Sequence, residues 1–215
     1  MFPTRRCLLP ICYLPSTNCV SLTLVKLTIT VSCLVDCLYL FDCCFDSLST
    51  LIINVSNIFG FEISKDLQKK LLKLKCFSLS SPKFTVDYDD LIVPLLCQMV
   101  NLEELKLYLL VERFDSTYVD GIQLYDQFLV YMTQLKKFTF NIKTNVFNNF
   151  LKVKLPSNEA IQHTFIGRDY QQVTSYVYNN SMETEGKCLI YSVPYEFDCF
   201  FHLDNSFQGG IIFHK

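Results

Sequence analysis

Bulky apolar residues recur along the first two thirds of the chain in one short pattern. Each copy reads Leu, two residues, an apolar residue, one residue, and a second apolar residue. The five copies occupy residues 24–29, 48–53, 74–79, 102–107 and 135–140, so that successive copies begin 24, 26, 28 and 33 residues apart. Alternating apolar and polar positions predict a half-buried strand. We therefore expect five strand-forming units that stack, because no single unit can bury its apolar face alone.

The segments between these strands follow a helical period instead. Apolar residues three and four positions apart predict helices over about 34–45, 63–74, 87–99 and 120–132. Pro94 marks either the start of the third helix or a kink in it. In the fourth helix we expect Ile122, Tyr125, Leu129 and Met132 to face inward. The repeat interval and this alternation predict an α/β leucine-rich-repeat solenoid, with a parallel sheet on the concave side and helices on the convex side.

The pattern changes after residue 150. Residues 156–165 predict a capped short helix, residues 171–178 and 188–193 two strands joined by a polar turn, and residues 197–203 another short helix. We therefore divide the chain into an irregular leader (1–22), about five leucine-rich repeats (23–150), and an irregular capping or inserted hairpin segment that ends in a partial repeat (151–215). Because neither end has an evident polar cap, we expect a fragment of a longer product.

Composition and charge narrow the class of protein. Half of the 215 residues are hydrophobic and 19% are charged, which indicates a folded chain. The formal net charge is -2, so no overall basic field attracts nucleic acid, and we expect no nucleic-acid partner. The dense lysine stretch over residues 65–75 is best interpreted as a solvated helix face.

The cysteines and the apolar N-terminus bear on compartment. Eleven cysteines are present, an odd number without any Cys-x-x-Cys pair, which favours reduced, buried thiols over zinc ligation or a disulfide framework. Lys26 and Asp36 interrupt the apolar run over residues 20–41, so we expect a cytoplasmic protein without a membrane anchor. The alternative is a secreted or membrane-tethered repeat receptor that uses residues 1–41 as a signal or anchor. Disulfides or a glycan at Asn179 would favour that alternative.

Catalytic motifs are not evident in the sequence. It has no Gly-x-Ser-x-Gly, no phosphate-binding glycine loop and no His-Glu-x-x-His. Cys97 or Cys188 could form a nucleophile pair with His163, but buried thiols explain these cysteines more simply. We therefore expect a non-enzyme that needs no cofactor and no metal.

Strand alternation predicts which side chains face the concave side. Those of the first three strands are small and uncharged apart from Lys26, whereas the last two strands present charged, aromatic and amide groups. We expect a protein partner to bind the residues of the last two strands. The alternative is a merely solvated sheet surface. The candidate protein-binding residues are Glu104, Lys106, Tyr108, Lys137, Thr139 and Asn141.

The repeat motifs resemble those of F-box proteins with leucine-rich repeats. The similarity is closest over residues 101–107 and 132–140, and extends to 155–165 and 185–195. The resemblance implies a substrate-selecting repeat region of a ubiquitin-ligase receptor. It implies binding of the adaptor Skp1 only if a missing F-box lies upstream, since the F-box itself is not present in this chain. We therefore expect a non-catalytic protein-interaction module whose partner the sequence does not identify.

Overall fold

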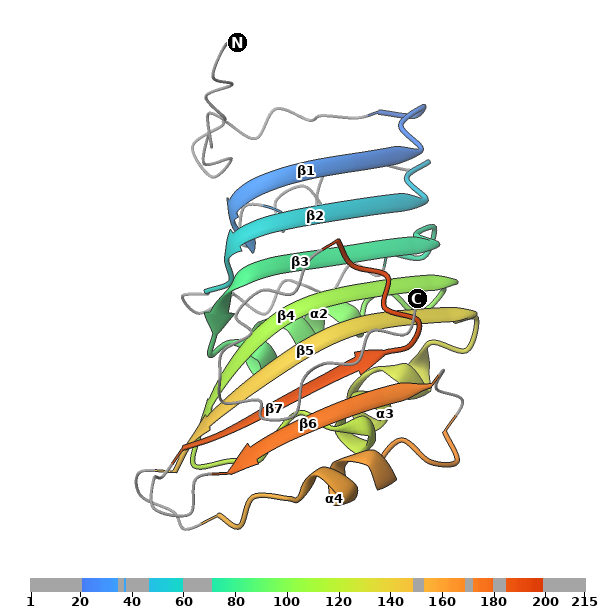
Figure 1. The fold of residues 1–215 in the computed structure, drawn as a ribbon. Coiled ribbons are helices and arrows are strands. Elements are labelled where there is room, and N and C mark those ends of the chain that lie inside the picture. Colours follow the sequence, from blue (N-terminus) through green and yellow to red (C-terminus); the bar gives the residue numbers. More distant parts are fainter. Residues whose placement is uncertain are drawn as a thin grey trace.

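A computed structural model describes residues 21–34, 37, 47–59, 71–148, 153–168, 172–179 and 185–198. These residues form an α/β fold built on one curved, seven-stranded sheet with the order β1-β2-β3-β4-β5-β7-β6 (Figure 1). Strands β1 to β5 run parallel, whereas β7 is antiparallel to β5 and to β6. The strands are β1 (Lys26–Cys33), β2 (Thr50–Asn57), β3 (Cys76–Thr85), β4 (Glu104–Phe114), β5 (Lys137–Phe147), β6 (Val173–Asn179) and β7 (Glu185–Ser192).

The five strands predicted from the repeated motif are confirmed, and they pair in one continuous register. Three rows of side chains therefore cross the first five strands. The first row is Lys26, Thr50, Cys76, Glu104 and Lys137; the second is Thr28, Ile52, Ser78, Lys106 and Thr139; the third is Thr30, Asn54, Ser80, Tyr108 and Asn141. Beyond the third row the register of β3 and β4 shifts between Ser80 and Phe84. The shift surrounds Pro82, which cannot donate to a sheet ladder.

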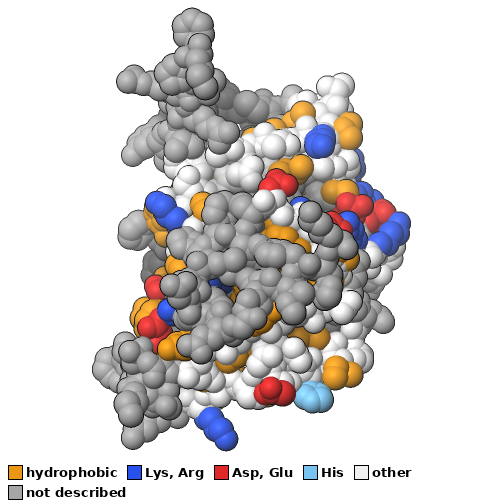
Figure 2. Space-filling model, in the orientation of Figure 1, with side chains coloured by type: hydrophobic (Ala, Val, Ile, Leu, Met, Phe, Trp, Pro, Cys, Tyr) orange, Lys and Arg blue, Asp and Glu red, His pale blue; other side chains and the backbone are white. Residues whose placement is uncertain are grey.

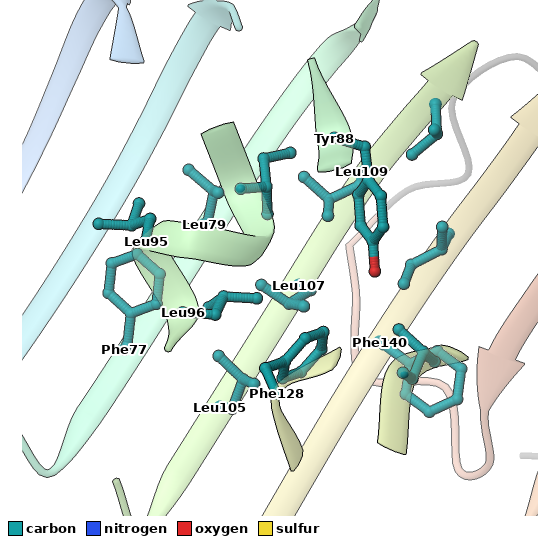
Figure 3. Close-up of a cluster of buried hydrophobic side chains, with 14 of the residues drawn as sticks. Phe77, Leu79, Tyr88, Leu95, Leu96, Leu105, Leu107, Leu109, Phe128 and Phe140 are labelled. Carbon is teal, nitrogen blue, oxygen red and sulfur yellow. The ribbon is translucent and has the colours of Figure 1, made fainter. Parts of the chain in front are cut away.

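The alternate positions of each strand fill the core (Figure 3). Leu79, Leu107 and Phe140 occupy one row across β3 to β5 and are at most 1% exposed. Aromatic rings extend the packing, since the Phe138 and Phe140 rings stack at 4.8 Å between centroids. Full burial of each such side chain contributes about 1.5–3 kcal/mol. This repeated burial holds the strands in register.

The helices in the described residues are short. They are η2 (Tyr88–Ile92), α2 (Val93–Leu96), α3 (Gly121–Gln127), η3 (Leu129–Tyr131) and α4 (Asn158–His163). Figure 1 shows α2 and α3 behind the sheet, on the side expected for return segments. Pro94 lies in the first turn of α2, so it marks the start of this helix rather than a kink. The helix predicted over 34–45 lies mostly outside the described residues, as does most of the one predicted over 63–74.

The inward face predicted for α3 is wrong in its first half. Ile122 is 41% exposed and Tyr125 38% exposed, whereas Leu124 and Phe128 are fully buried. The carboxylate of Asp120 accepts a hydrogen bond from Gln123 N and caps the helix, so that it begins at Gly121. The positions facing inward are therefore 121, 124 and 128, three and four residues apart.

Gly121 fixes this rotation. Its N–H donates to Thr164 Oγ1 at 2.9 Å, and a Cβ atom at this position would lie 2.6 Å from Thr164 O. Only a residue without a side chain fits so close to another backbone. The other two predicted inward residues lie beyond the helix: Met132 is buried and Leu129 is half-buried.

The segment after residue 150 is more regular than predicted. Its hairpin forms, but it continues the main sheet, because β7 pairs with β5 from Asn141 to Phe147 and β6 pairs with β7 along its length. The edge of β5 would otherwise present unpaired N–H and C=O groups, and the hairpin satisfies them. The predicted capped helix is confirmed as α4, whose Ser157 side chain accepts a hydrogen bond from Ala160 N. Residues 1–20 of the predicted leader and the partial repeat lie outside the described residues.

Candidate functional site

The face of the sheet turned away from α2 and α3, called the front face below, carries an open groove. The groove has a volume of about 540 Å³ and runs across β1 to β5. It is lined by most residues of the three register rows, by Phe77, Leu79 and Leu105, and by Glu196, Phe197 and Asp198. Strand alternation directs the polar positions here because the apolar positions fill the opposite side.

The structure brings the six predicted binding residues together on the β4 and β5 part of this face. They are not equally accessible. Tyr108, Thr139 and Asn141 are only 2–3% exposed, Lys106 and Lys137 are half-buried, and Glu104 is exposed. A role of these residues in binding a partner stays a prediction, but in this conformation half of them are covered.

The chain itself contributes to this cover. Residues 193–198, called the strap below, follow β7 and cross in front of β5 and β4 toward β3 (Figure 1). Pro194 cannot continue the sheet ladder, so the chain leaves the sheet at this point. Ser192 replaces the lost backbone partner of Phe140: its hydroxyl accepts from Phe140 N at 3.1 Å and donates to Phe140 O at 3.4 Å. The strap therefore begins from a fixed position at the edge of β5.

Polar contacts hold the strap against the β4 and β5 part of the front face. Lys106 Nζ donates to the backbone carbonyl of Glu196 at 2.6 Å, and Lys137 Nζ forms an ion pair with Glu196 Oε2 at 2.7 Å. Asn141 Nδ2 donates to Tyr195 Oη at 2.8 Å. The hydrogen bond to Glu196 raises the pKa of Lys137 above its ordinary value. Three of the six predicted residues thus form polar contacts with the chain's own segment.

Aromatic contacts complete the arrangement. The Phe197 ring meets Tyr108 edge to face, with centroids 5.3 Å apart, and Lys106 Nζ lies 4.5 Å from the Phe197 centroid. The Tyr195 ring packs between Phe197 and Tyr191, at 5.4 and 5.7 Å. Burial is the main cause that raises the pKa of Tyr191 to about 12. Edge-to-face pairs of this kind contribute about 0.5–1.5 kcal/mol beyond their buried area.

The first three strands present a different front surface. Lys26, Thr28, Thr30 and Asn54 are exposed, and Ile52 and Ser78 are half-buried. Thr50, Cys76 and Ser80 are also half-buried, and apart from Lys26 all of these side chains are uncharged. None of the front side chains of β1 to β3 is fully buried, whereas Tyr108, Thr139 and Asn141 on β4 and β5 are.

A charged cluster marks the edge where the parallel strands begin. The Glu103 carboxylate binds Lys136 at 2.6 Å and Lys75 at 3.1 Å, and joins the approaches to β3, β4 and β5. Acidic and basic side chains gather at the right-hand edge of the face in Figure 2. The hydrogen bond and charge of Lys136, followed by those of Lys75, lower the pKa of Glu103. The cluster carries one acidic and two basic groups, so it leaves a net positive charge at this end of the front face.

The buried thiol predicted at Cys188 is confirmed, whereas Cys97 is half-buried. The five cysteines in the described residues are free thiols. Cys188 is 1% exposed, and burial raises its pKa far above the ordinary value, whereas His163 lies exposed on α4. Burial also raises the pKa of Cys97, whose thiol donates to Gln127 O at 3.2 Å. Within the described ranges, no group of three or more His, Cys, Asp and Glu side chains is placed to hold a metal ion.

Two observations concern the receptor alternative. The amide of Asn179 donates to Pro156 O at 3.1 Å and accepts a hydrogen bond from Tyr118 Oη. A glycan on Asn179 Nδ2 would interfere with the first of these bonds. Among the helices of the described residues, none is long and apolar enough to cross a membrane.

Comparison with known proteins gives no match for this chain, whether with protein families, curated proteins or solved structures.

Proposed function

We propose that this chain is a non-catalytic protein-interaction module of the leucine-rich-repeat type, and that its front face binds an extended segment of a partner protein. The repeat assignment is supported by the motif interval and by three rows in continuous register across β1 to β5. One observation carries the binding role: the groove already accommodates an extended polypeptide, the strap, and Lys106 contacts its backbone carbonyl.

The front side chains of β1 to β3 suit recognition of a polypeptide backbone. Hydroxyl and amide side chains such as Thr28, Asn54 and Ser78 can both donate and accept hydrogen bonds. Ile52 adds an apolar contact between them. Such a surface binds main-chain groups without selecting strongly among side chains. Selectivity therefore has to come from the front side chains of β4 and β5.

The size of the front face limits how many partner residues β1 to β3 can contact alone. Neighbouring strands lie about 4.8 Å apart, so β1 to β3 span roughly 10 Å, enough for about three residues of an extended segment. The five parallel strands span roughly 19 Å, enough for about six residues. A stable interface buries about 800 Å² on each partner. Tight binding therefore requires more of the front face than the first three strands provide.

Site-specific photo-crosslinking tests this proposal. A photoreactive amino acid is placed at Ile52 or Ser78 in the groove, and at Gln134 as an exposed control away from it. We expect both groove positions to crosslink the same protein in cells, and Gln134 to crosslink it weakly or not at all. Equal labelling from all three positions would contradict binding at the front face. Recruitment to a ubiquitin ligase is a separate prediction that depends on an F-box upstream of this chain.

A further inference from the structure

We propose that the partner segment is acidic and aromatic, and that it binds by displacing the strap from β4 and β5. This inference rests on the proposed binding function and adds the chemistry of the partner and a mode of regulation. The strap occupies the β4 and β5 part of the front face, and its side chains indicate which chemistry this part recognises.

Charge complementarity is the first argument. The charged groove residues of the sheet are three lysines and one glutamate: Lys26, Lys106, Lys137 and Glu104. The strap brings Glu196 and Asp198 into the same groove. With the strap removed, the sheet surface has an excess of positive charge, which attracts acidic segments and repels basic ones.

The second argument is the pairing of each strap group with a matching sheet group. The Glu196 carboxylate binds Lys137, its backbone carbonyl binds Lys106, and the Phe197 ring packs on Tyr108 beneath the Lys106 ammonium. Lys106 favours an aromatic side chain at the position of Phe197, and Lys137 favours an acidic side chain at the preceding position. A partner with the order aromatic, acidic, aromatic can form all of these contacts.

The strap is also attached weakly enough to be displaced. Glu196 and Asp198 are exposed and Tyr195 and Phe197 are only half-buried. The ion pair between Lys137 and Glu196 leaves 40% and 36% of the two side chains exposed, and exposed pairs contribute little. The tether to β7 keeps these individually weak contacts occupied. Such a tether gives a local concentration on the order of millimolar, which an untethered competitor has to overcome.

A peptide titration tests the inference on the full chain. The probe is a fluorescently labelled peptide with the sequence of residues 192–198, Ser-Val-Pro-Tyr-Glu-Phe-Asp. It is titrated by fluorescence anisotropy against the wild-type chain and against the double variant Glu196→Ala, Phe197→Ala, in which the strap is weakened and the groove is intact. If the tethered strap competes at roughly millimolar local concentration, the double variant should bind the peptide at least about tenfold more tightly.

Matched controls locate the binding. On the strap-weakened background, Lys106→Ala with Lys137→Ala should abolish peptide binding. Thr28→Ala, on the exposed front of β1, should change the affinity for the peptide by less than about twofold. A control peptide with Gln for Glu and Asn for Asp should bind at least about tenfold more weakly than the acidic peptide. Circular dichroism checks that every variant keeps the fold of the wild type.

Two results would overturn the inference. One is no detectable binding of the peptide to the strap-weakened variant. The other is equal binding to the wild type, the strap-weakened variant and the Lys106/Lys137 variant, which would place the peptide elsewhere. Crosslinking from Ile52 and Ser78 separates this failure from that of the proposed function. If those crosslinks persist while the peptide does not bind, the groove binds a partner of different chemistry.

Discussion

The front side chains of β1 to β3 and those of β4 and β5 occupy equivalent places in one sheet, yet they differ in accessibility, most clearly in the third row. In the third row, Thr30 and Asn54 are exposed, whereas Tyr108 and Asn141 are 3% and 2% exposed. The strand pairing is the same at each of these positions. The difference comes in part from the strap, whose Glu196 meets Lys106 from 90 residues away in sequence.

The direction in which a side chain faces and its accessibility are therefore determined separately. The repeated motif determines which side chains face the front, since alternation is a local property of a strand. Accessibility at the same positions depends on a segment that joins the sheet from the other end of the fold. A row of polar residues is therefore a binding surface only where no part of the chain already occupies it.

The largest contrast is expected between two members of the third row. Tyr108→Ala should lower the free energy of unfolding by about 3–4 kcal/mol, because it removes a buried aromatic ring packed on Phe197. Asn54→Ala, at the corresponding exposed position of β2, should change it by less than about 0.5 kcal/mol. Urea denaturation of both variants measures the difference. Similar values would mean that Tyr108 is as accessible as Asn54.

The next largest effect concerns a buried charge at the end of β4. Arg113 is 7% exposed, and its Nη2 lies 2.8 and 2.9 Å from the two Asp89 oxygens, while Nη1 donates to Gln123 Oε1 at 2.7 Å. Arg113→Ala should cost about 2–3 kcal/mol, since it removes a largely buried guanidinium that donates to Asp89 and Gln123, whereas the remaining Asp89 carboxylate is 49% exposed and stays hydrated. Lys26→Ala on exposed β1 is the matched control and should be near neutral in the same denaturation experiment.

A smaller effect is expected where the hairpin joins the sheet. A Cβ atom at Gly186 of β7 would collide with Tyr118 Oη and Leu155 Cδ1. Because Tyr118 is fully buried, Gly186→Ala should destabilise the protein by about 2 kcal/mol through overpacking. Adding Tyr118→Phe removes one colliding atom and should recover part of the loss in thermal denaturation. Strictly additive losses would argue against this collision.

The smallest effect tests the charged link between the two parts of the sheet. The folded-state pKa of Glu103 is lowered by Lys136 and Lys75, so its contribution to stability is present above the unfolded value of about 4.3. That contribution is lost as the pH falls through the lower folded-state pKa. Glu103→Gln should therefore lower the melting temperature slightly at neutral pH, and the difference from wild type should vanish in strong acid. A difference that grows in acid would contradict the lowered pKa.

Much of the sheet could be predicted because its signal is local and repeated. Leu105 and Leu107 show the apolar spacing of the motif, and Lys106 between them had to face the opposite side. The rotation of α3 could not be predicted in the same way. Ile122 and Tyr125 mimic an inward stripe, while the decisive residue, Gly121, has no side chain and acts through its closeness to Thr164. Contact with a distant backbone leaves no periodic pattern.

The strap was missed for a related reason. Residues from 197 onward were interpreted as the start of a helix, but Phe197 and Asp198 are not helical. The alternation of aromatic and acidic residues after Pro194 was the available signal. It gained meaning only when Lys106 and Lys137 were brought opposite it by the register of β4 and β5.

The most direct test uses the fact that the chain contains no tryptophan. Phe197→Trp introduces a single indole into the strap, so its fluorescence reports only on that position. If the strap lies on Tyr108 and Lys106, the emission should be blue-shifted and partly protected from acrylamide quenching, and adding Lys106→Ala and Lys137→Ala should shift it to the red. An emission spectrum and quenching rate equal to those of free tryptophan in the folded protein would contradict the account.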